Sequence, residues 1–224
     1  MNTMSDVRAA PADDCTADFA LAGHLLELVE REREVLARAL HDEMGSNLTA
    51  INLDVASVAS QLPEGVARTR LERALRVLKE AVELKRRLIQ SLRPSMIDSL
   101  GLVATLRMEM EAFERRSGIA CAARFDEEPP GLDARVAMAI YRLVQDCTRW
   151  LEADGRATKL AARLTPDGAE LCLLLESDVG PANFDLTAVH TMRARLTHFG
   201  GSLEATTGAE GLRLAARVPA RPAA

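Results

Sequence analysis

Two long runs of regularly spaced apolar residues, joined by a very short turn, constrain the fold more than any other feature. In the first run, apolar residues recur every three, four or seven positions, which is typical of one helix face: Leu25, Val29, Leu36, Leu40, Met44, Leu48, Ile51, Val55, Val58 and Leu62. Pro63-Glu64-Gly65 breaks the pattern. The second run, which ends at Arg93-Pro94, contains Leu71, Leu75, Leu78, Val82, Ile89 and Leu92. Helices joined so closely must run antiparallel, and the half-covered apolar stripe predicts pairing of two copies into a four-helix bundle.

The pattern changes after Pro94. Helical spacing predicts helices over residues 101–117, 132–153 and 186–199, the last ending at Gly200-Gly201. Alternating or continuous apolar runs predict strands over residues 119–125, 158–164, 170–176 and 212–218, with Thr165-Pro166-Asp167-Gly168 as a hairpin turn. The predicted fold class is α+β, with three parts: a disordered N-terminus (1–18), a helical hairpin (19–97) and an α/β sandwich (98–220).

Composition and charge exclude several classes of function. A net charge of −5 gives no electrostatic case for a nucleic-acid surface. The four cysteines are far apart and form no metal-ligand spacing, which is typical of reduced cysteines in the cytoplasm. Neither an apolar run of membrane-spanning length nor a signal peptide is evident, so the sequence predicts a cytoplasmic protein with no membrane partner.

His41 and Asp42 stand in the middle of the first helical run. An exposed histidine can take a phosphoryl group on a ring nitrogen, and the adjacent carboxylate can hold the ring and accept its proton. By itself, a single helix histidine is more often a surface or packing residue. The other histidines, His24, His190 and His198, have no comparable context and are interpreted as structural.

Several motifs along the chain, taken in their order, help to interpret His41 and Asp42. They are Glu32 to Gly45, Leu92-Arg93-Pro94-Ser95 with Leu100 to Leu106, Ile140 to Asp146, Met192 to Leu196 and Phe199 to Leu203. Together they span about residues 25 to 219, and their shared order resembles the sensor histidine kinases of the nitrate/nitrite-sensor subclass. Those proteins join a dimerising phosphoacceptor hairpin to an ATP-binding sandwich of the gyrase/Hsp90/kinase type. The resemblance implies two-component signal transduction, a homodimer, His41 as phosphoacceptor with Asp42 as its acid, and a response-regulator receiver domain as partner.

The sequence departs from that family where ATP and magnesium would bind. Trp150 stands where the family has a Mg²⁺-binding asparagine, four residues after Asp146, which matches the acid of the family's Gln-Glu pair. An indole only donates hydrogen bonds and cannot ligate a hard cation. Asp178 matches the adenine-reading aspartate and Gly180 the first glycine of the following turn, but the second glycine is Ala182. These changes predict a degenerate ATP-binding domain with a vestigial nucleotide site, no metal site, and no productive Mg-ATP complex.

The favoured interpretation is a dimeric histidine phosphotransfer protein that exchanges phosphate between His41 and receiver aspartates. Ser46 occupies the position where phosphatase-active relatives carry Gln or His, which argues against a phosphatase role. One alternative is an active, divergent histidine kinase in which Asp146, Glu152 or Asp154 replaces the metal ligand. The other is a non-enzymatic partner that sequesters a response regulator or a kinase. A related possibility is pairing with an active kinase that phosphorylates His41 in trans.

Overall fold

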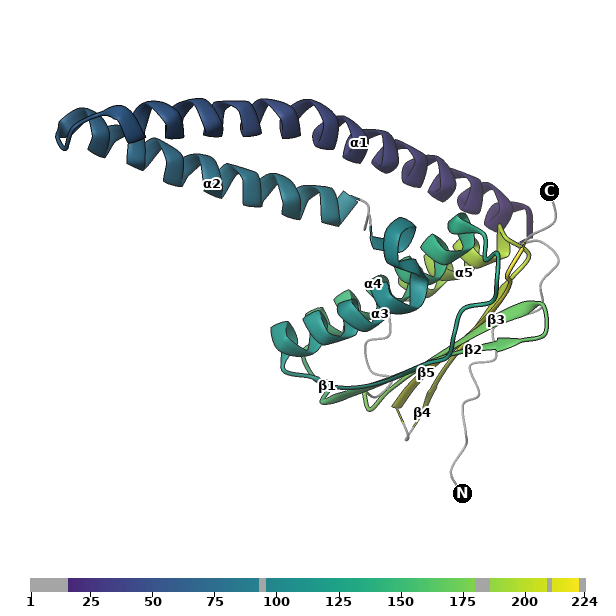
Figure 1. Ribbon diagram of the computed structural model, residues 1–224. Coiled ribbons are helices and arrows are strands. Elements are labelled where there is room, and N and C mark those ends of the chain that lie inside the picture. Colours follow the sequence, from purple (N-terminus) through teal and green to yellow (C-terminus); the bar gives the residue numbers. More distant parts are fainter. Residues whose placement is uncertain (1–15, 93–95, 180–185, 209–210, 222–224) are drawn as a thin grey trace, which may run out of the picture. The chain divides into compact units, whose positions relative to one another are not determined.

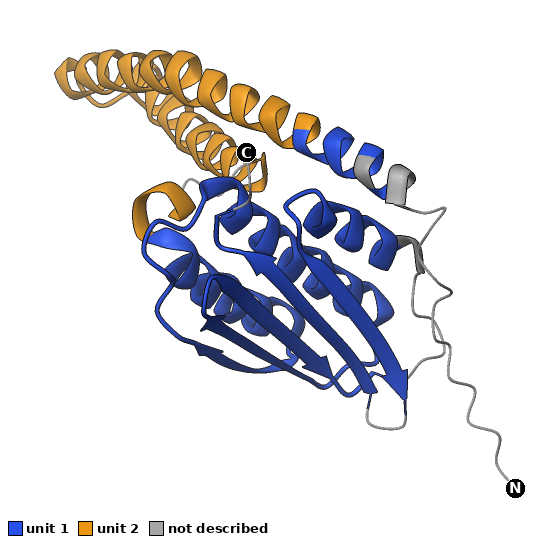
Figure 2. Ribbon diagram, turned by 90° about the vertical axis from the view of Figure 1, so that its right-hand side faces the viewer, with its two compact units in different colours: residues 1–27, 101–224 blue, residues 28–100 orange. Residues whose placement is uncertain are grey.

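Figure 1 shows the computed structural model, which describes residues 16–92, 96–179, 186–208 and 211–221. The chain forms two compact units, which Figure 2 colours separately. We call residues 28–100 the hairpin unit, and residues 1–27 with 101–224 the sandwich unit. The domain boundaries expected after residues 18 and 97 stay predictions. Most of the N-terminal segment expected to be disordered lies outside the described residues.

The hairpin unit is built from α1 (Thr16–Gln61), whose first turns belong to the sandwich unit, and α2 (Val66–Leu92). As α2 begins, the carbonyl oxygen of Gly65 accepts hydrogen bonds from the backbone N–H and the hydroxyl of Thr69, at 3.0 and 3.1 Å. The predicted apolar stripe of α2 is buried or half-buried along its length: Leu71, Leu75, Leu78, Val82, Ile89 and Leu92. The predicted helical hairpin is therefore confirmed.

The sandwich unit contains a five-stranded sheet in the order β1-β2-β3-β5-β4. Its strands are β1 (Ala120–Phe125), β2 (Lys159–Asp167), β3 (Glu170–Ser177), β4 (Ser202–Gly208) and β5 (Gly211–Pro219). Strand β1 pairs parallel with β2, which is possible because the helix α4 (Ala134–Asp154) crosses between them; the remaining pairs are antiparallel. The sheet is mixed, and the predicted α+β class is confirmed.

Helices cover one face of this sheet. They are α3 (Met96–Ser117), α4 and α5 (Leu186–Thr197), and Figure 1 shows them on the same side of the strands. Side chains alternate accordingly along β2 and β3, where every second residue is buried, as at Leu160, Leu164, Leu171 and Leu173. The fully buried core lies between this face and the helices, and includes Leu102, Leu106, Met110, Phe113, Ile140, Leu143 and Leu151.

The structure adds details that local patterns did not predict. Strand β4 was not expected, because Leu203 is the one buried residue in an otherwise polar or small segment. Helix α3 begins before the expected residue 101 and kinks at Gly101, whose φ of 81° favours glycine. After the kink, the Glu128 carboxylate accepts hydrogen bonds from the N–H groups of Leu102 (2.8 Å) and Val103 (3.3 Å). These bonds satisfy donors at the start of the resumed helix.

The hairpin between β2 and β3 is tighter than expected. Pairing continues through Pro166 and Asp167, which lie opposite Leu171 and Glu170. The connection is therefore a two-residue loop after Asp167, rather than a turn that begins at Thr165. Gly168, in this loop, has a φ of 62°, a value that glycine adopts without strain.

Candidate functional site

His41 lies on the exposed surface of α1, as a phosphoacceptor must. Asp42 and Glu43 are exposed as well. Successive residues of a helix point about 100° apart, so His41 and Asp42 do not face each other. Within the described part of the chain, neither side chain has a hydrogen-bond or ion-pair partner. Their roles as phosphoacceptor and acid stay predictions.

The residues one turn after His41 have defined environments. The Ser46 hydroxyl donates to the backbone carbonyls of Asp42 (3.0 Å) and Glu43 (3.4 Å), so it is engaged by its own helix. A Cβ atom on Gly45 would lie 3.2 Å from the ammonium nitrogen of Lys85, on α2. Helix positions four apart share a face, so this cation lies near the helix face that carries His41. Sequence reasoning missed Lys85, because only the packing of the hairpin brings it to this face.

The second group of predicted site residues belongs to the sandwich unit. On α4, the half-buried carboxylate of Asp146 accepts from Arg149 at 3.1 Å and from Arg195 of α5 at 3.4 Å. Trp150 lies one helical turn further on and is half-buried. Asp146 therefore joins α4 to α5 through an ion pair with a buried arginine.

Asp178 follows β3 and is bound to the start of β2. Its Oδ1 accepts from the backbone N–H groups of Thr158 (3.0 Å) and Lys159 (3.2 Å), and its Oδ2 accepts from the Thr158 hydroxyl. Burial alone would raise the pKa of Asp178, but these hydrogen bonds outweigh it and lower the pKa below its ordinary value. The carboxylate is thus held ionised as an acceptor for the β2 backbone. Thr158 was not predicted to belong to this site.

Other expectations near the nucleotide site have mixed outcomes. Gly180 and Ala182 lie outside the described residues, so the expected glycine turn is not tested. Residues 188–191, which follow this turn, are helical and belong to α5. Among the described residues, no cluster of three or more His, Cys, Asp or Glu side chains is suited to a metal ion.

Three cysteines, Cys121, Cys147 and Cys172, are free thiols. No described helix combines the length and apolar character needed to span a bilayer.

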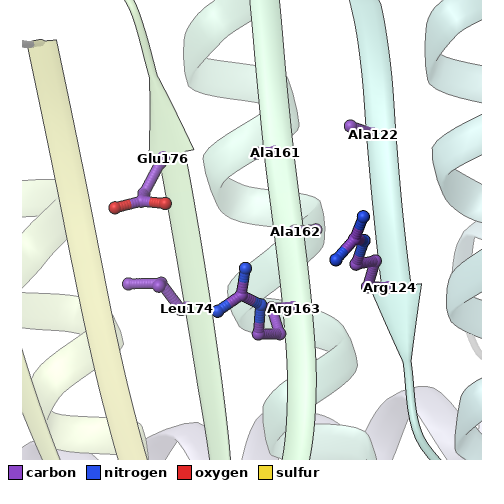
Figure 3. A pocket seen from close by; sticks show the side chains of 7 residues that line it. All are labelled: Ala122, Arg124, Ala161, Ala162, Arg163, Leu174 and Glu176. Atoms are coloured by element: carbon purple, nitrogen blue, oxygen red, sulfur yellow. The ribbon is translucent and has the colours of Figure 1, made fainter.

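The open face of the sheet carries a shallow hollow of about 130 Å³ that the sequence did not predict. Figure 3 shows its lining, with Ala122 and Arg124 from β1, residues 161–163 from β2, and Leu174 and Glu176 from β3. Arg124 and Arg163 are register partners on adjacent strands. The Oε1 atom of Glu176 lies 3.7 Å from Nε of Arg213.

Comparisons with known proteins place these residues in a family. The family model described as "Histidine kinase" matches residues 32–96, which include His41 and most of the hairpin. The sensor histidine kinase MctS of Rhizobium johnstonii is 30% identical over 212 residues, which cover 89% of this chain and 46% of that protein. The signal transduction histidine-protein kinase/phosphatase UhpB of Salmonella typhimurium is 26% identical over 210 residues, covering 90% and 41%. The chain thus spans about half the length of these relatives.

A solved structure gives the same result for the fold. The histidine kinase domain of the blue-light activated kinase EL346 from Erythrobacter litoralis matches with a TM-score of 0.50 at 16% identity. The match covers 78% of this chain and 94% of that one. This likeness shows that the two share a fold. The chain therefore belongs to the sensor histidine kinase family, in the subclass typified by nitrate/nitrite sensors.

Proposed function

We propose that this protein is a dimeric two-component phosphotransfer protein, in which His41 exchanges a phosphoryl group with the aspartate of a receiver domain. The observation that carries the proposal is a contrast between two regions. His41 is exposed within the segment that matches the histidine kinase family, whereas the groups that would hold Mg-ATP are replaced or bonded internally. The proposed place of action is the cytoplasm.

The nucleotide side of this contrast concerns three residues. Trp150 offers no lone pair to a magnesium ion. The Asp146 carboxylate is bound by two arginines, and the Asp178 carboxylate already accepts three hydrogen bonds from Thr158 and Lys159. Phosphoryl transfer from ATP requires a metal and positioned donors to neutralise the developing charge. Loss of the metal ligand supports the proposal that this chain does not phosphorylate His41 by itself.

The acceptor side requires only an accessible imidazole and an aligned phosphodonor. A neutral ring nitrogen of His41 attacks the phosphorus of the receiver's aspartyl phosphate, and the receiver carboxylate leaves. The ring then releases its other proton, which the exposed carboxylate of Asp42 can accept through a bridging water molecule. The reverse reaction returns the phosphoryl group to the aspartate. No ATP is consumed in either direction.

Exposed apolar side chains on the hairpin support a homodimer. Several of them are 42–58% exposed and recur every four, seven or eight residues, which keeps them on one side of each helix: Leu36, Met44, Ile51 and Val58 on α1, and Val77, Leu84 and Leu88 on α2. Exposed apolar side chains that gather on one side of an element usually mark an interface. A second hairpin would cover it in a four-helix bundle, leaving the outer surface of α1 with His41 for the receiver domain.

A labelling experiment tests the proposal. We would incubate the protein with a panel of receiver domains that carry ³²P on their aspartates, and follow transfer of label to the dimer. We expect acid-labile label that His41→Gln abolishes. His24→Gln is a matched control, because His24 is also an exposed histidine of α1. Label that persists in His41→Gln would refute the assignment of His41.

Two further incubations separate the alternatives. Label acquired at His41 from γ-³²P-ATP and Mg²⁺ alone would make the protein an active, divergent kinase. Receiver binding that survives His41→Gln, with no phosphohistidine detected, would instead favour sequestration without chemistry. Calorimetry with ATP, with and without Mg²⁺, then reports whether a vestigial nucleotide site remains. The proposal predicts no magnesium-dependent gain in affinity.

A further inference from the structure

One charged residue interrupts the apolar stripe of α2. Buried and half-buried residues recur there in strict alternation of four and three positions, as in the seam of a coiled coil: Leu71, Leu75, Leu78, Val82, Lys85, Ile89 and Leu92. Lys85 is the one member of this stripe that is not apolar. Because the seam of a helix faces its partner helix, the position of Lys85 directs its side chain toward α1.

The ammonium group of Lys85 lies against Gly45, in the middle of α1. A Cβ atom on Gly45 would lie 3.2 Å from Lys85 Nζ, so any larger residue would crowd the ammonium group. Glycine is unfavourable in the interior of a helix, and here it leaves room for that group. The two residues therefore fit each other across the hairpin.

This contact brings the ammonium group close to the predicted phosphoacceptor. His41 lies one turn before Gly45 on the same helix and is exposed. Cβ atoms four residues apart in a helix are separated by about 5–6 Å. A lysine carries its charge on a flexible four-carbon stem, so Lys85 can turn from Gly45 toward a group attached to the His41 ring.

Lys85 has no counter-charge of its own. Within the described part of the chain, its ammonium group has no hydrogen-bond or ion-pair partner, whereas Arg33 and Arg68 of the same hairpin pair with glutamates on their own helices. A half-buried ammonium group loses water and regains nothing unless an anion binds it. An apolar residue would pack better at a seam position. The site therefore calls for an anion that the folded chain does not supply.

We propose that Lys85 binds the phosphoryl group carried by His41, an inference that rests on the proposed phosphotransfer function. A phosphoryl group brings about two negative charges and three acceptor oxygens to the ring. The ammonium group donates hydrogen bonds to these oxygens and neutralises part of the charge that they carry during transfer. Lys85 loses no proton, and the bonds that form and break remain those of His41 and the receiver aspartate.

A ³¹P NMR titration tests this contact without a receiver domain. Phosphoramidate, a small chemical phosphodonor, would phosphorylate the full-length protein, and the signal that disappears in His41→Gln identifies the phosphoryl group on His41. A nearby ammonium group favours the dianion and so lowers the pKa of that phosphoryl group. We expect Lys85→Met to raise this pKa by about half a unit or more, and Lys85→Arg, which keeps the charge, to stay close to the wild type.

Lys79→Met is the matched control. It removes the same charge from an exposed position of the same helix, about 9 Å from Lys85 along the axis, and should leave the phosphoryl pKa unchanged. Equal pKa values in Lys85→Met and the wild type would overturn the proposal. An equal shift in Lys79→Met would also overturn it, because the net charge of α2 would then be responsible.

A purely structural role of Lys85 has a different signature. A charged residue in a seam can fix how two helices pair, at a cost in stability. In that case, Lys85→Met would raise the unfolding midpoint and leave the phosphoryl pKa of the wild type unchanged. This combination would overturn the proposed contact.

The labelled receiver panel separates this contact from the proposed function. We expect Lys85→Met to accept label about tenfold more slowly than the wild type. A pKa that depends on Lys85, together with no transfer from any receiver, would refute the phosphotransfer function and support the contact. Transfer at equal rates with an unchanged pKa would refute the contact alone.

Discussion

The exposed apolar face of the hairpin allows the proposed dimer to be tested at a single residue. Leu84 leaves 50% of its surface exposed, and it lies seven residues after Val77 and four before Leu88 on the same side of α2. In a four-helix bundle, a second hairpin would cover this side chain. We expect Leu84→Ala to weaken the dimer while the hairpin itself stays folded, because the side chain is only half-buried within one chain.

The size of the effect follows from the exposed fraction. Complete burial of a leucine side chain is worth about 1.5–3 kcal/mol, so the exposed half contributes about 1 kcal/mol when a partner covers it. A symmetric dimer contains the substitution twice, which makes the loss about 2 kcal/mol. Since each 1.4 kcal/mol is about tenfold in affinity, the dissociation constant of the dimer should rise about 30-fold.

Sedimentation velocity over a dilution series measures this constant directly. Leu53→Ala is the matched control, because Leu53 is even more exposed, at 64%, but lies two residues from Ile51 and so on the far side of α1. We expect its dimer to match the wild type. An unchanged dissociation constant in Leu84→Ala, or an equal weakening in Leu53→Ala, would refute the proposed interface.

Three smaller predictions concern the sandwich unit. Thr158→Val removes a hydrogen bond that helps to lower the pKa of Asp178, so carboxyl NMR should show this pKa moving up. A lowered carboxyl pKa stabilises the fold above the pKa of the unfolded chain, and this stabilisation is lost as the pH falls through the pKa of the folded protein, so the variant should be less stable than the wild type at pH 7. A difference in stability that persists in acid would contradict this explanation. Burial, assisted by the charge of Glu114, raises the pKa of Cys121 to about 11. Iodoacetamide should therefore modify Cys121 slowly at pH 8, where about one thiol in a thousand is ionised, and the rate of modification should rise until about pH 11. Fast labelling of the folded protein at pH 8 would exclude such a pKa. Glu128→Gln weakens the carboxylate cap on the helix after Gly101, and urea unfolding should show a loss of about 1 kcal/mol; an unchanged midpoint would mean that the cap contributes nothing.

The helices were predictable because their signal is local. Helical spacing of apolar residues between Leu25 and Leu92 indicated both helices of the hairpin, and Pro63-Glu64-Gly65 marked the turn between them. Strands β2, β3 and β5 alternate or run apolar, because one face of each is buried. Strand β4 was missed, since its sequence buries only Leu203 and its position depends on pairing with β5. Register with a neighbour is a tertiary property that a polar edge strand does not encode.

The candidate site divides in the same way. The sequence located His41 on the first helix, Asp146 and Trp150 on α4, and Asp178 after β3, because each belongs to a motif of consecutive residues. It did not reveal which groups bind them. Thr158 lies 20 residues from Asp178, and Arg195 lies 49 from Asp146.

By itself, the sequence determined the family, the helical hairpin and the departures from the ATP-binding pattern, because periodicity and motifs are written along the chain. Only the tertiary structure decided how the remaining groups are used. Packing bound Asp178 to the start of β2 and joined Asp146 to α5. These contacts arise when distant segments fold together, so their geometry depends on the whole sandwich rather than on any local pattern.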